Sequence, residues 1–118
     1  MKRYVKGDVM GPKGVAVTDD QLQMMKNSSV QAAGLMKALS HPTRLLLICQ
    51  LVDGEKSVSN LVKLLDMRQS SVSQQLARLR KEGLVKTRRD SQVVYYSVAD
   101  ARIINVITVM CEQFCVSE

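Results

Sequence analysis

The chain has 118 residues, enough for one domain with a real core but too few for two independent folds. Its 46% hydrophobic and 24% charged residues are typical of a globular domain, and 3% aromatics argue against a single-strand binder that stacks bases on rings. The longest apolar run, residues 45–49, is too short to span a membrane, and no apolar stretch follows the basic N-terminus as in a secretory signal. We therefore expect a cytoplasmic protein with no membrane partner, whose three cysteines are kept as thiols.

The net charge of +6 is concentrated in two stretches, residues 1–18 and residues 68–89, and the rest of the chain is net negative. A concentrated basic patch is typical of proteins that bind polyanions. A solvated charged face would give the same pattern, so charge alone leaves both readings open.

Residues 1–17 contain three glycines and one proline without periodicity, and we expect a flexible basic N-terminal arm. Residues 18–118 are expected to form one domain. Thr18 followed by Gln21 predicts a capping box that opens a helix ending near Leu39.

A second helix is predicted from Thr43 to about Val52, with Pro42 at its first position. It is apolar nearly all round, so it should be buried. After the turn at residues 53–54, a short helix is expected, capped by Ser57 or Ser59. Its three leucines, Leu61, Leu64 and Leu65, are expected to face inward.

A further helix is predicted from about Gln69 to Glu82, ended by Gly83. Residues 84–89 and 92–98 predict a β-hairpin joined through Asp90-Ser91, because they are rich in strand-forming residues. A last helix to about Cys115 carries two apolar stripes: Ile103, Ile107, Met110 and Phe114, and Ile104, Cys111 and Cys115.

This order of elements predicts a mainly α fold with a β-hairpin wing, which is a winged helix-turn-helix. The helix that begins at Gln69 is the expected reader of the major groove. Its polar face offers side chains that can reach bases and phosphates: Gln69, Ser70, Ser73, Gln74 and Arg78. Two arginines, Arg88 and Arg89, are expected at the hairpin tip, near phosphate or the minor groove. The alternative is that these polar residues only solvate an amphipathic helix.

Residues 37–98 resemble the ArsR/SmtB family of bacterial winged-helix repressors. The resemblance lies in four runs: Ala38-Leu-Ser-His-Pro-Thr-Arg-Leu45, Gln69-Ser-Ser-Val-Ser-Gln-Gln-Leu76, Leu79-Arg-Lys-Glu-Gly-Leu-Val85 and Val94-Tyr-Tyr96. It implies a homodimer, formed by the first and last helices, that binds a palindromic DNA operator and releases it when an inducer binds. It also implies that Gln69, Ser70, Ser73 and Gln74 face the bases.

The chain departs from the metal-sensing members of that family. It has Ser57-Val58-Ser59 where they have Cys-x-Cys, and Asp100-Ala101-Arg102 where others begin a site with Asp-x-His. Hydroxyl groups are poor ligands for soft metals, and the only histidine is His41. We expect neither a metal nor a cofactor, and keep a repressor that responds to a metal or to another ligand as an alternative.

Cys49 and Cys115 match, residue by residue, the pair found in the persulfide- and oxidant-sensing branch of the family that contains HlyU, BigR and SqrR. The resemblance implies that a persulfide, polysulfide or oxidant links these thiols and that DNA is then released. Without the resemblance, Cys49 in an apolar helix would be read as a small packed hydrophobe. Cys111 has no counterpart in that pair, and it could join, compete or do nothing.

No Cys-x-x-Cys, Ser-His-Asp set or phosphate loop is present, so we do not expect an enzyme. A thiol oxidoreductase would consume oxidant continuously, whereas a sensor would stop after one equivalent per cysteine pair. A regulator that activates by displacing a DNA-coating protein, as members of the HlyU type do, is a further alternative.

Overall fold

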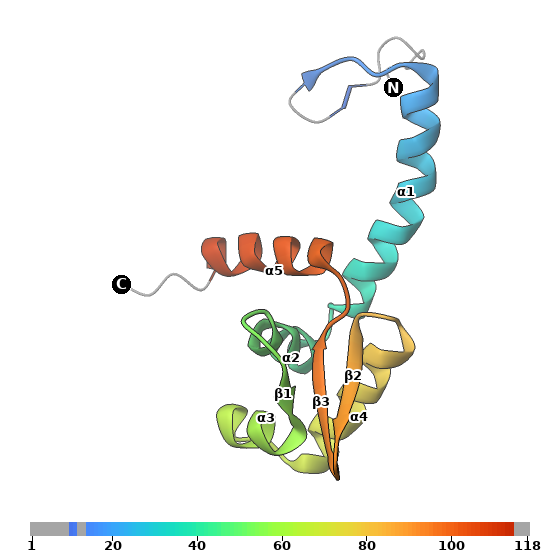
Figure 1. The fold of residues 1–118 in the computed structure, drawn as a ribbon. Coiled ribbons are helices and arrows are strands. Elements are labelled where there is room, and N and C mark those ends of the chain that lie inside the picture. Colours follow the sequence, from blue (N-terminus) through green and yellow to red (C-terminus); the bar gives the residue numbers. More distant parts are fainter. Residues whose placement is uncertain (1–9, 12–13, 115–118) are drawn as a thin grey trace. The chain divides into compact units, whose positions relative to one another are not determined.

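A computed structural model of the chain describes residues 10, 11 and 14–114. The chain divides into two compact units, residues 1–37 and residues 38–118. The second unit is a winged helix-turn-helix (Figure 1), which confirms the predicted fold class. Its elements are α2 (Pro42–Leu51), β1 (Lys56–Ser57), α3 (Val58–Leu65), α4 (Gln69–Lys81), β2 (Val85–Asp90), β3 (Val93–Val98) and α5 (Ala101–Phe114).

The first unit consists mainly of the helix α1 (Asp19–Ala38), preceded by one β-bridge between Met10 and Ala16. The predicted capping box is confirmed, because the Gln21 N–H donates to Thr18 Oγ1 at 3.2 Å and the Thr18 N–H donates to Gln21 Oε1 at 2.9 Å. Ala38 is the only buried residue of α1. Along this helix Met24, Val30 and Met36 are exposed, so its apolar side chains have no cover within the unit.

The start of α2 is set by His41 and Pro42. The Thr43 N–H donates to His41 Nδ1 at 3.2 Å, and Pro42 fills a position whose missing N–H needs no partner. The expectation that this helix is buried nearly all round is correct for one face only. Leu47 and Ile48 are fully buried, whereas Leu46 is 46% exposed.

The helix-turn-helix is formed by α3 and α4. Ser57, not Ser59, caps α3, because Ser57 Oγ accepts the Asn60 N–H at 3.2 Å. Asp66 ends α3 with a φ of +50°, a left-handed backbone that turns the chain sharply into α4. Leu61 is fully buried, but the expectation that Leu64 faces inward is wrong, since its side chain is 57% exposed. An eight-residue helix buries only a narrow stripe, and Leu64 lies beside it rather than on it.

The end of α4 fixes where the wing begins. Gly83 has a φ of +78°, the Leu84 N–H donates to Leu79 O at 2.9 Å and the Gly83 N–H donates to Arg80 O at 3.0 Å. These two bonds form a Schellman motif, with buried Leu84 packed at the helix end. The chain therefore leaves α4 in one defined direction.

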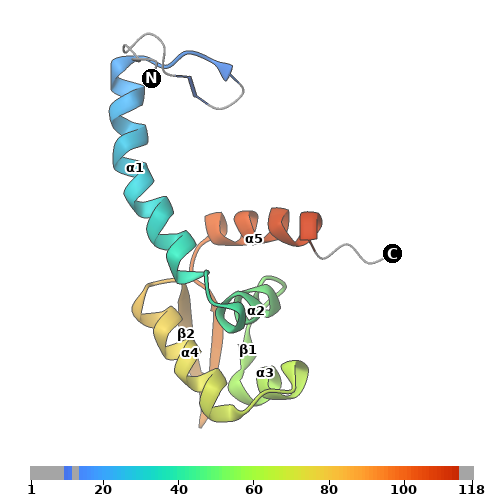
Figure 2. The ribbon, with the colours of Figure 1, turned by 180° about the vertical axis from the view of Figure 1, so that it is seen from behind.

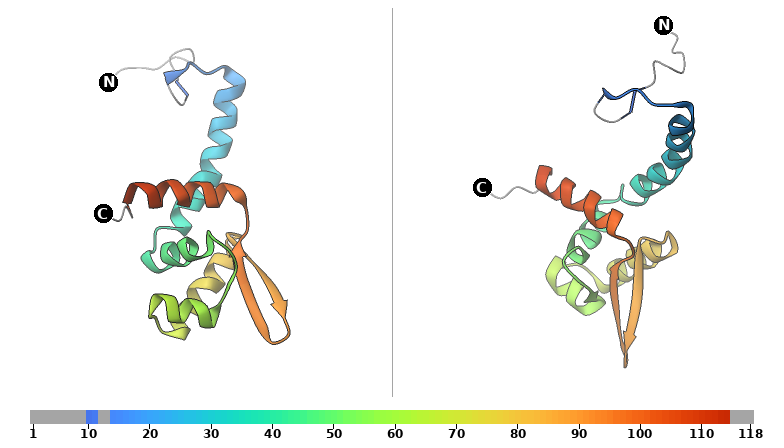
Figure 3. Two further views of the ribbon diagram at one scale, coloured as in Figure 1. Left: turned by 60° about the vertical axis from the view of Figure 1, so that its left-hand side comes forward. Right: turned by 45° about the horizontal axis from the view of Figure 1, so that its top comes forward.

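The wing belongs to a three-stranded antiparallel sheet with the order β1-β3-β2. The sequence predicted only the hairpin, because a two-residue strand carries no pattern of its own; Lys56 and Ser57 pair with Tyr96 and Tyr95. The hairpin closes at the pair formed by Asp90 and Val93, so the turn lies one residue later than predicted. Its tip stands clear of the helices (Figure 3).

The last helix, α5, crosses α2 and contacts it (Figures 1 and 2). Asp100 begins α5 by accepting the Arg102 N–H at 2.6 Å, and Ile107 anchors it in the core. Phe114 is 85% exposed, so part of a predicted stripe faces solvent in the single chain, and Val109, outside both stripes, is 57% exposed. No described helix is long and apolar enough to cross a membrane.

Candidate nucleic-acid interface and cysteine pair

One face of α4 carries the residues that were predicted to read DNA. Val72, Leu76 and Leu79 are fully buried and hold the opposite face against the core. All five predicted side chains of α4 are exposed, and they are Gln69, Ser70, Ser73, Gln74 and Arg78. The structure therefore brings them together on one solvent-facing surface. Their contact with bases stays a prediction.

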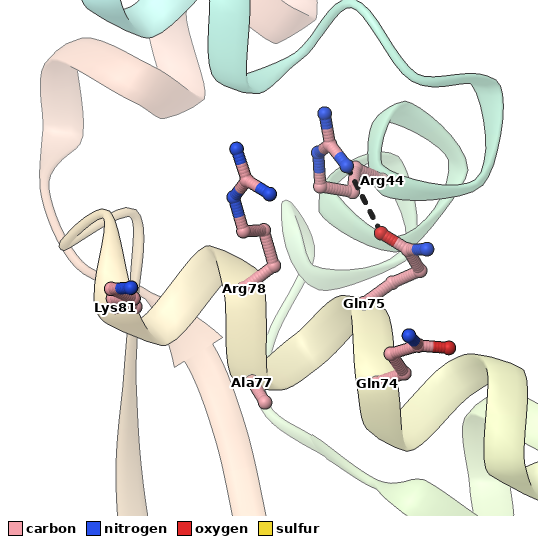
Figure 4. A pocket seen from close by; sticks show the side chains of 6 residues that line it. All are labelled: Arg44, Gln74, Gln75, Ala77, Arg78 and Lys81. Carbon is pink, nitrogen blue, oxygen red and sulfur yellow. Dashed lines mark hydrogen bonds between the residues drawn. The ribbon is translucent and has the colours of Figure 1, made fainter.

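A shallow hollow next to this face gathers positive charge from two helices (Figure 4). It is lined by Arg44 of α2 and by five residues of α4, which are Gln74, Gln75, Ala77, Arg78 and Lys81. Arg78 is 55% exposed and lies 3.4 Å from Glu82 at the nearest atoms, so its guanidinium stays open to solvent on one side. Three cations around an open hollow can attract a phosphate group of a DNA backbone.

Arg44 also fixes α4 in place, a role that the sequence analysis missed. Its Nε donates to Ala38 O at 2.6 Å and its Nη1 donates to Gln75 Oε1 at 3.1 Å. The second of these bonds joins α2 to α4. The available signal was weak: Arg44 lies in a run that carries the family resemblance, but nothing in the sequence pairs it with Gln75.

In the wing, Arg88 is held by neighbouring side chains. Its Nε and Nη2 donate to the two carboxylate oxygens of Glu55 at 3.1 and 2.5 Å, and its guanidinium carbon lies 4.8 Å from the centre of the Tyr95 ring. The hydrogen bond from Arg88 lowers the pKa of Glu55, and the same bond raises the pKa of Arg88. A phosphate that met Arg88 would therefore meet a carboxylate beside it. Nothing in the sequence pairs Arg88 with Glu55.

Arg89 is placed differently. Arg88 and Arg89 lie two pairs and one pair inside the closing pair of the hairpin, so both sit on β2 rather than in the turn. Arg89 is exposed, and within residues 14–114 it forms no ion pair. Of the two arginines, Arg89 is therefore the more available to a phosphate.

The two described cysteines meet across the contact of α2 with α5. Cys49 Sγ lies 3.6 Å from Cys111 Sγ, both residues are partly buried, and neither is in a disulfide. The role of Cys111 was left open above, because no sequence pattern relates residues that are 62 positions apart. Cys115, the predicted partner of Cys49, lies outside the described residues.

The positions that bind metals in other members of the family are occupied differently here. Ser57 Oγ is used as a helix cap, and the Asp100 carboxylate is bound by Arg102 Nη2 at 2.7 Å. The Arg102 side chain lowers the pKa of Asp100 by hydrogen bonding to it. Among the described residues, no three His, Cys, Asp or Glu side chains form a group that could hold a metal ion.

Comparison with known proteins places the chain in a family. The family profile described as "Bacterial regulatory protein, arsR family" matches residues 41–87. The biofilm growth-associated repressor of Agrobacterium fabrum is 38% identical over 106 residues, which cover 90% of this chain and 91% of that protein. The transcriptional activator HlyU of Vibrio cholerae is 38% identical over 94 residues, covering 80% and 87%.

The solved structures agree with the sequence comparison. The structure described as reduced HlyU from Vibrio cholerae N16961 superposes with a TM-score of 0.74 at 37% identity, covering 80% of this chain and 99% of that one. These relatives are regulators of transcription, as the family resemblance implied. The chain belongs to the ArsR family of bacterial winged-helix transcriptional regulators and is not an enzyme.

Proposed function

We propose that this chain is a homodimeric repressor that binds a palindromic operator and releases it when a persulfide, polysulfide or other oxidant links Cys49 to Cys115. The observation that carries the proposal is the contact between the thiols of Cys49 and Cys111. It supports a thiol switch because the thiol of Cys49 on α2 lies against Cys111 of α5. Cys115 follows Cys111 by four positions in the sequence.

Operator reading is assigned to α4. Its exposed polar face, the basic hollow beside it and the basic wing match the contacts that such proteins make to bases and phosphates. Gln74 is the most direct test of base reading. We expect Gln74→Ala to cost about 1–3 kcal/mol on the operator and much less on random DNA.

The route from the thiols to DNA runs through α2. Cys49 and Arg44 lie on the same helix, and Arg44 is bonded to Gln75 of the reading helix. A bond between Cys49 and Cys115, the residue that follows α5 in the sequence, would pull on α2, and through Arg44 on α4. A coupling of about 1–3 kcal/mol corresponds to a loss of operator affinity of about 5–150-fold.

The experiment measures operator affinity by fluorescence anisotropy before and after treatment with glutathione persulfide, using a DNA site selected from a random pool. The untreated chain, Cys49→Ser and Cys115→Ser should bind equally well. Treatment should release only the unsubstituted chain, and a thiol reductant should restore binding. Release of the treated Cys49→Ser variant would show that another ligand sets the switch.

The names of the relatives differ: the Agrobacterium relative is a repressor and the Vibrio relative is an activator. We prefer repression because the Agrobacterium relative matches more of this chain, 90% against 80%. The second candidate is therefore activation by displacing a DNA-coating protein. Transcription in vitro separates the two, because a repressor lowers transcript from bare DNA and a displacing activator raises it only when the coating protein is present.

A further inference from the structure

We infer that Cys49 and Cys111 are themselves a disulfide site, in which Cys111 is the thiol that first resolves a persulfide formed on Cys49. The inference rests on the proposed function for the oxidant, a low-molecular-weight persulfide. It adds a third cysteine, which the family resemblance does not assign, and an oxidised form that keeps the operator bound.

The geometry makes Cys111 a ready partner for Cys49. The two sulfur atoms are 3.6 Å apart, and a disulfide bond is about 2.05 Å long, so closure needs an approach of only about 1.6 Å. Rotation of the side chains can supply much of that approach. Because Cys111 follows buried Ile107 by one helical turn, its backbone is held in the packed part of α5.

Both cysteines are also within reach of a small reagent. Each cysteine is partly buried rather than fully enclosed, and the two helices that carry them, α2 and α5, contact each other. Holding two reacting groups in contact makes the second step effectively intramolecular, which strongly favours it over attack by an outside thiol.

The chemistry balances with the persulfide as the oxidant. The Cys49 thiolate attacks the outer sulfur of the persulfide R–S–SH, which gives Cys49–S–SH and releases R–S⁻. The Cys111 thiolate then attacks the inner sulfur, forms the Cys49–Cys111 disulfide and expels HS⁻. The sulfur that was transferred is reduced to sulfide, and the two thiols are oxidised by two electrons.

A bond between two sulfur atoms that are already in contact moves the helices little. The form with the Cys49–Cys111 disulfide should therefore still bind DNA. In the unsubstituted chain, the Cys115 thiolate can attack the Cys49 sulfur of this disulfide and release Cys111 as a thiolate. Cys111 then acts as an intermediate partner, and the bond to Cys115 produces the release that we propose above.

The test uses the full chain with Cys115→Ser, in which Cys111 is the only partner left for Cys49. After treatment with glutathione persulfide at low protein concentration, the number of thiols that react with iodoacetamide should fall from two to none. The intact mass of the monomer should fall by about 2 Da, the loss of two hydrogens. Operator affinity should stay within about threefold of the untreated value.

The matched variant Cys111→Ser identifies the site. It should lose the early Cys49–Cys111 disulfide, so that the first bond in a time course forms more slowly than in the unsubstituted chain. In the unsubstituted chain, digestion with trypsin and then with a protease that cuts after Glu112 separates Cys111 from Cys115. The linked peptides should contain Cys111 early and Cys115 late.

The outcomes separate this inference from the proposed function. If treated Cys115→Ser keeps both thiols, the Cys49–Cys111 site is wrong, even where the unsubstituted chain still releases DNA. If the disulfide forms but no chain releases DNA, the site stands and the redox switch falls. If Cys115→Ser forms the disulfide and also releases DNA, the site stands and the switching role of Cys115 falls.

Discussion

Arg44 connects α2 to two other helices through its side chain. Its guanidinium bonds the Ala38 carbonyl at the end of α1 and the Gln75 side chain in the middle of α4. A guanidinium group can hold two acceptors at once because its N–H groups have a fixed planar arrangement. Lysine, with a single ammonium, would keep the charge but lose that fork.

A double-mutant cycle between Arg44 and Gln75 should therefore give a coupling of about 0.5–1.5 kcal/mol in the free energy of unfolding, measured in urea. Arg44→Lys should recover only part of the loss. Arg80→Ala, on the exposed side of α4, is the control and should change stability by less than about 0.5 kcal/mol. Additive effects of Arg44→Ala and Gln75→Ala would contradict the contact.

Side-chain partners at this scale could not be predicted from the sequence. The pairs of Arg44 with Gln75, Arg88 with Glu55 and Cys49 with Cys111 are separated by 31, 33 and 62 positions. Residue type and local periodicity identified which face of α4 is polar, but periodicity holds no information on contacts between elements. For that reason Cys111 was left without a role, although its thiol touches that of Cys49.

At the scale of elements, local signals located the helices and strands to within about one residue. Capping residues, a terminal glycine and strand-forming runs act between near neighbours, so the sequence records them directly. The strand β1 was not predicted, because its two residues form a strand only by pairing with β3. The prediction for Leu64 was wrong because a short helix buries only a narrow stripe, and not every apolar residue of the helix lies on it.

The two candidate caps of α3 offer a direct comparison. Ser57→Ala should destabilise the chain by about 0.5–2 kcal/mol, because the Asn60 N–H loses its acceptor, the hydroxyl of buried Ser57. Ser59→Ala, two residues later and exposed, should change the free energy of unfolding by less than about 0.5 kcal/mol. Thermal or urea unfolding of the two variants measures the difference. Equal effects would mean that the Ser57 cap contributes nothing.

The wing arginines should differ in how they affect the salt dependence of DNA binding. Arg89→Ala should lower the slope of log affinity against log salt by about one phosphate contact. Arg88→Ala should lower it less, because Glu55 already neutralises that guanidinium. Affinity measured across a range of salt concentrations tests this. A larger loss for Arg88 than for Arg89 would contradict the placement of these two residues.

The Glu55–Arg88 pair also predicts a pH dependence. The pKa of Glu55 is lowered in the folded chain, so its contribution is present above the unfolded pKa and is lost as pH falls through the folded pKa. The difference in unfolding free energy between the unsubstituted chain and Glu55→Gln should therefore shrink from about pH 6 to about pH 3. A difference that stays constant over this range would show that the pair does not stabilise the fold.

At the scale of the whole molecule, apolar side chains of two helices lack cover. Val30 of α1 and Phe114 of α5 are 74% and 85% exposed in the single chain. Regulators of this family commonly dimerise, and we propose that a second copy covers these helices. The sequence indicated the stripes but could not show which of their residues the single chain itself would bury.

Light scattering should give a mass of about twice the 13.1 kDa of one chain. Val109→Glu on α5 should weaken the dimer at least tenfold, because it would bury a charge in the proposed interface. Leu64→Glu on α3 is the matched control, because both side chains are 57% exposed, and it should leave the dimer intact. A monomer at all concentrations, or equal effects of the two variants, would refute the interface.

Ser57 ends one strand and begins one helix. It pairs with Tyr95 in the wing and caps α3 in the helix-turn-helix, so the two halves of the DNA-binding surface share a residue. We therefore expect them to approach the double helix together. An operator with the right bases on a differently bent or wound duplex should then bind more weakly, so that the curvature of the site contributes to recognition.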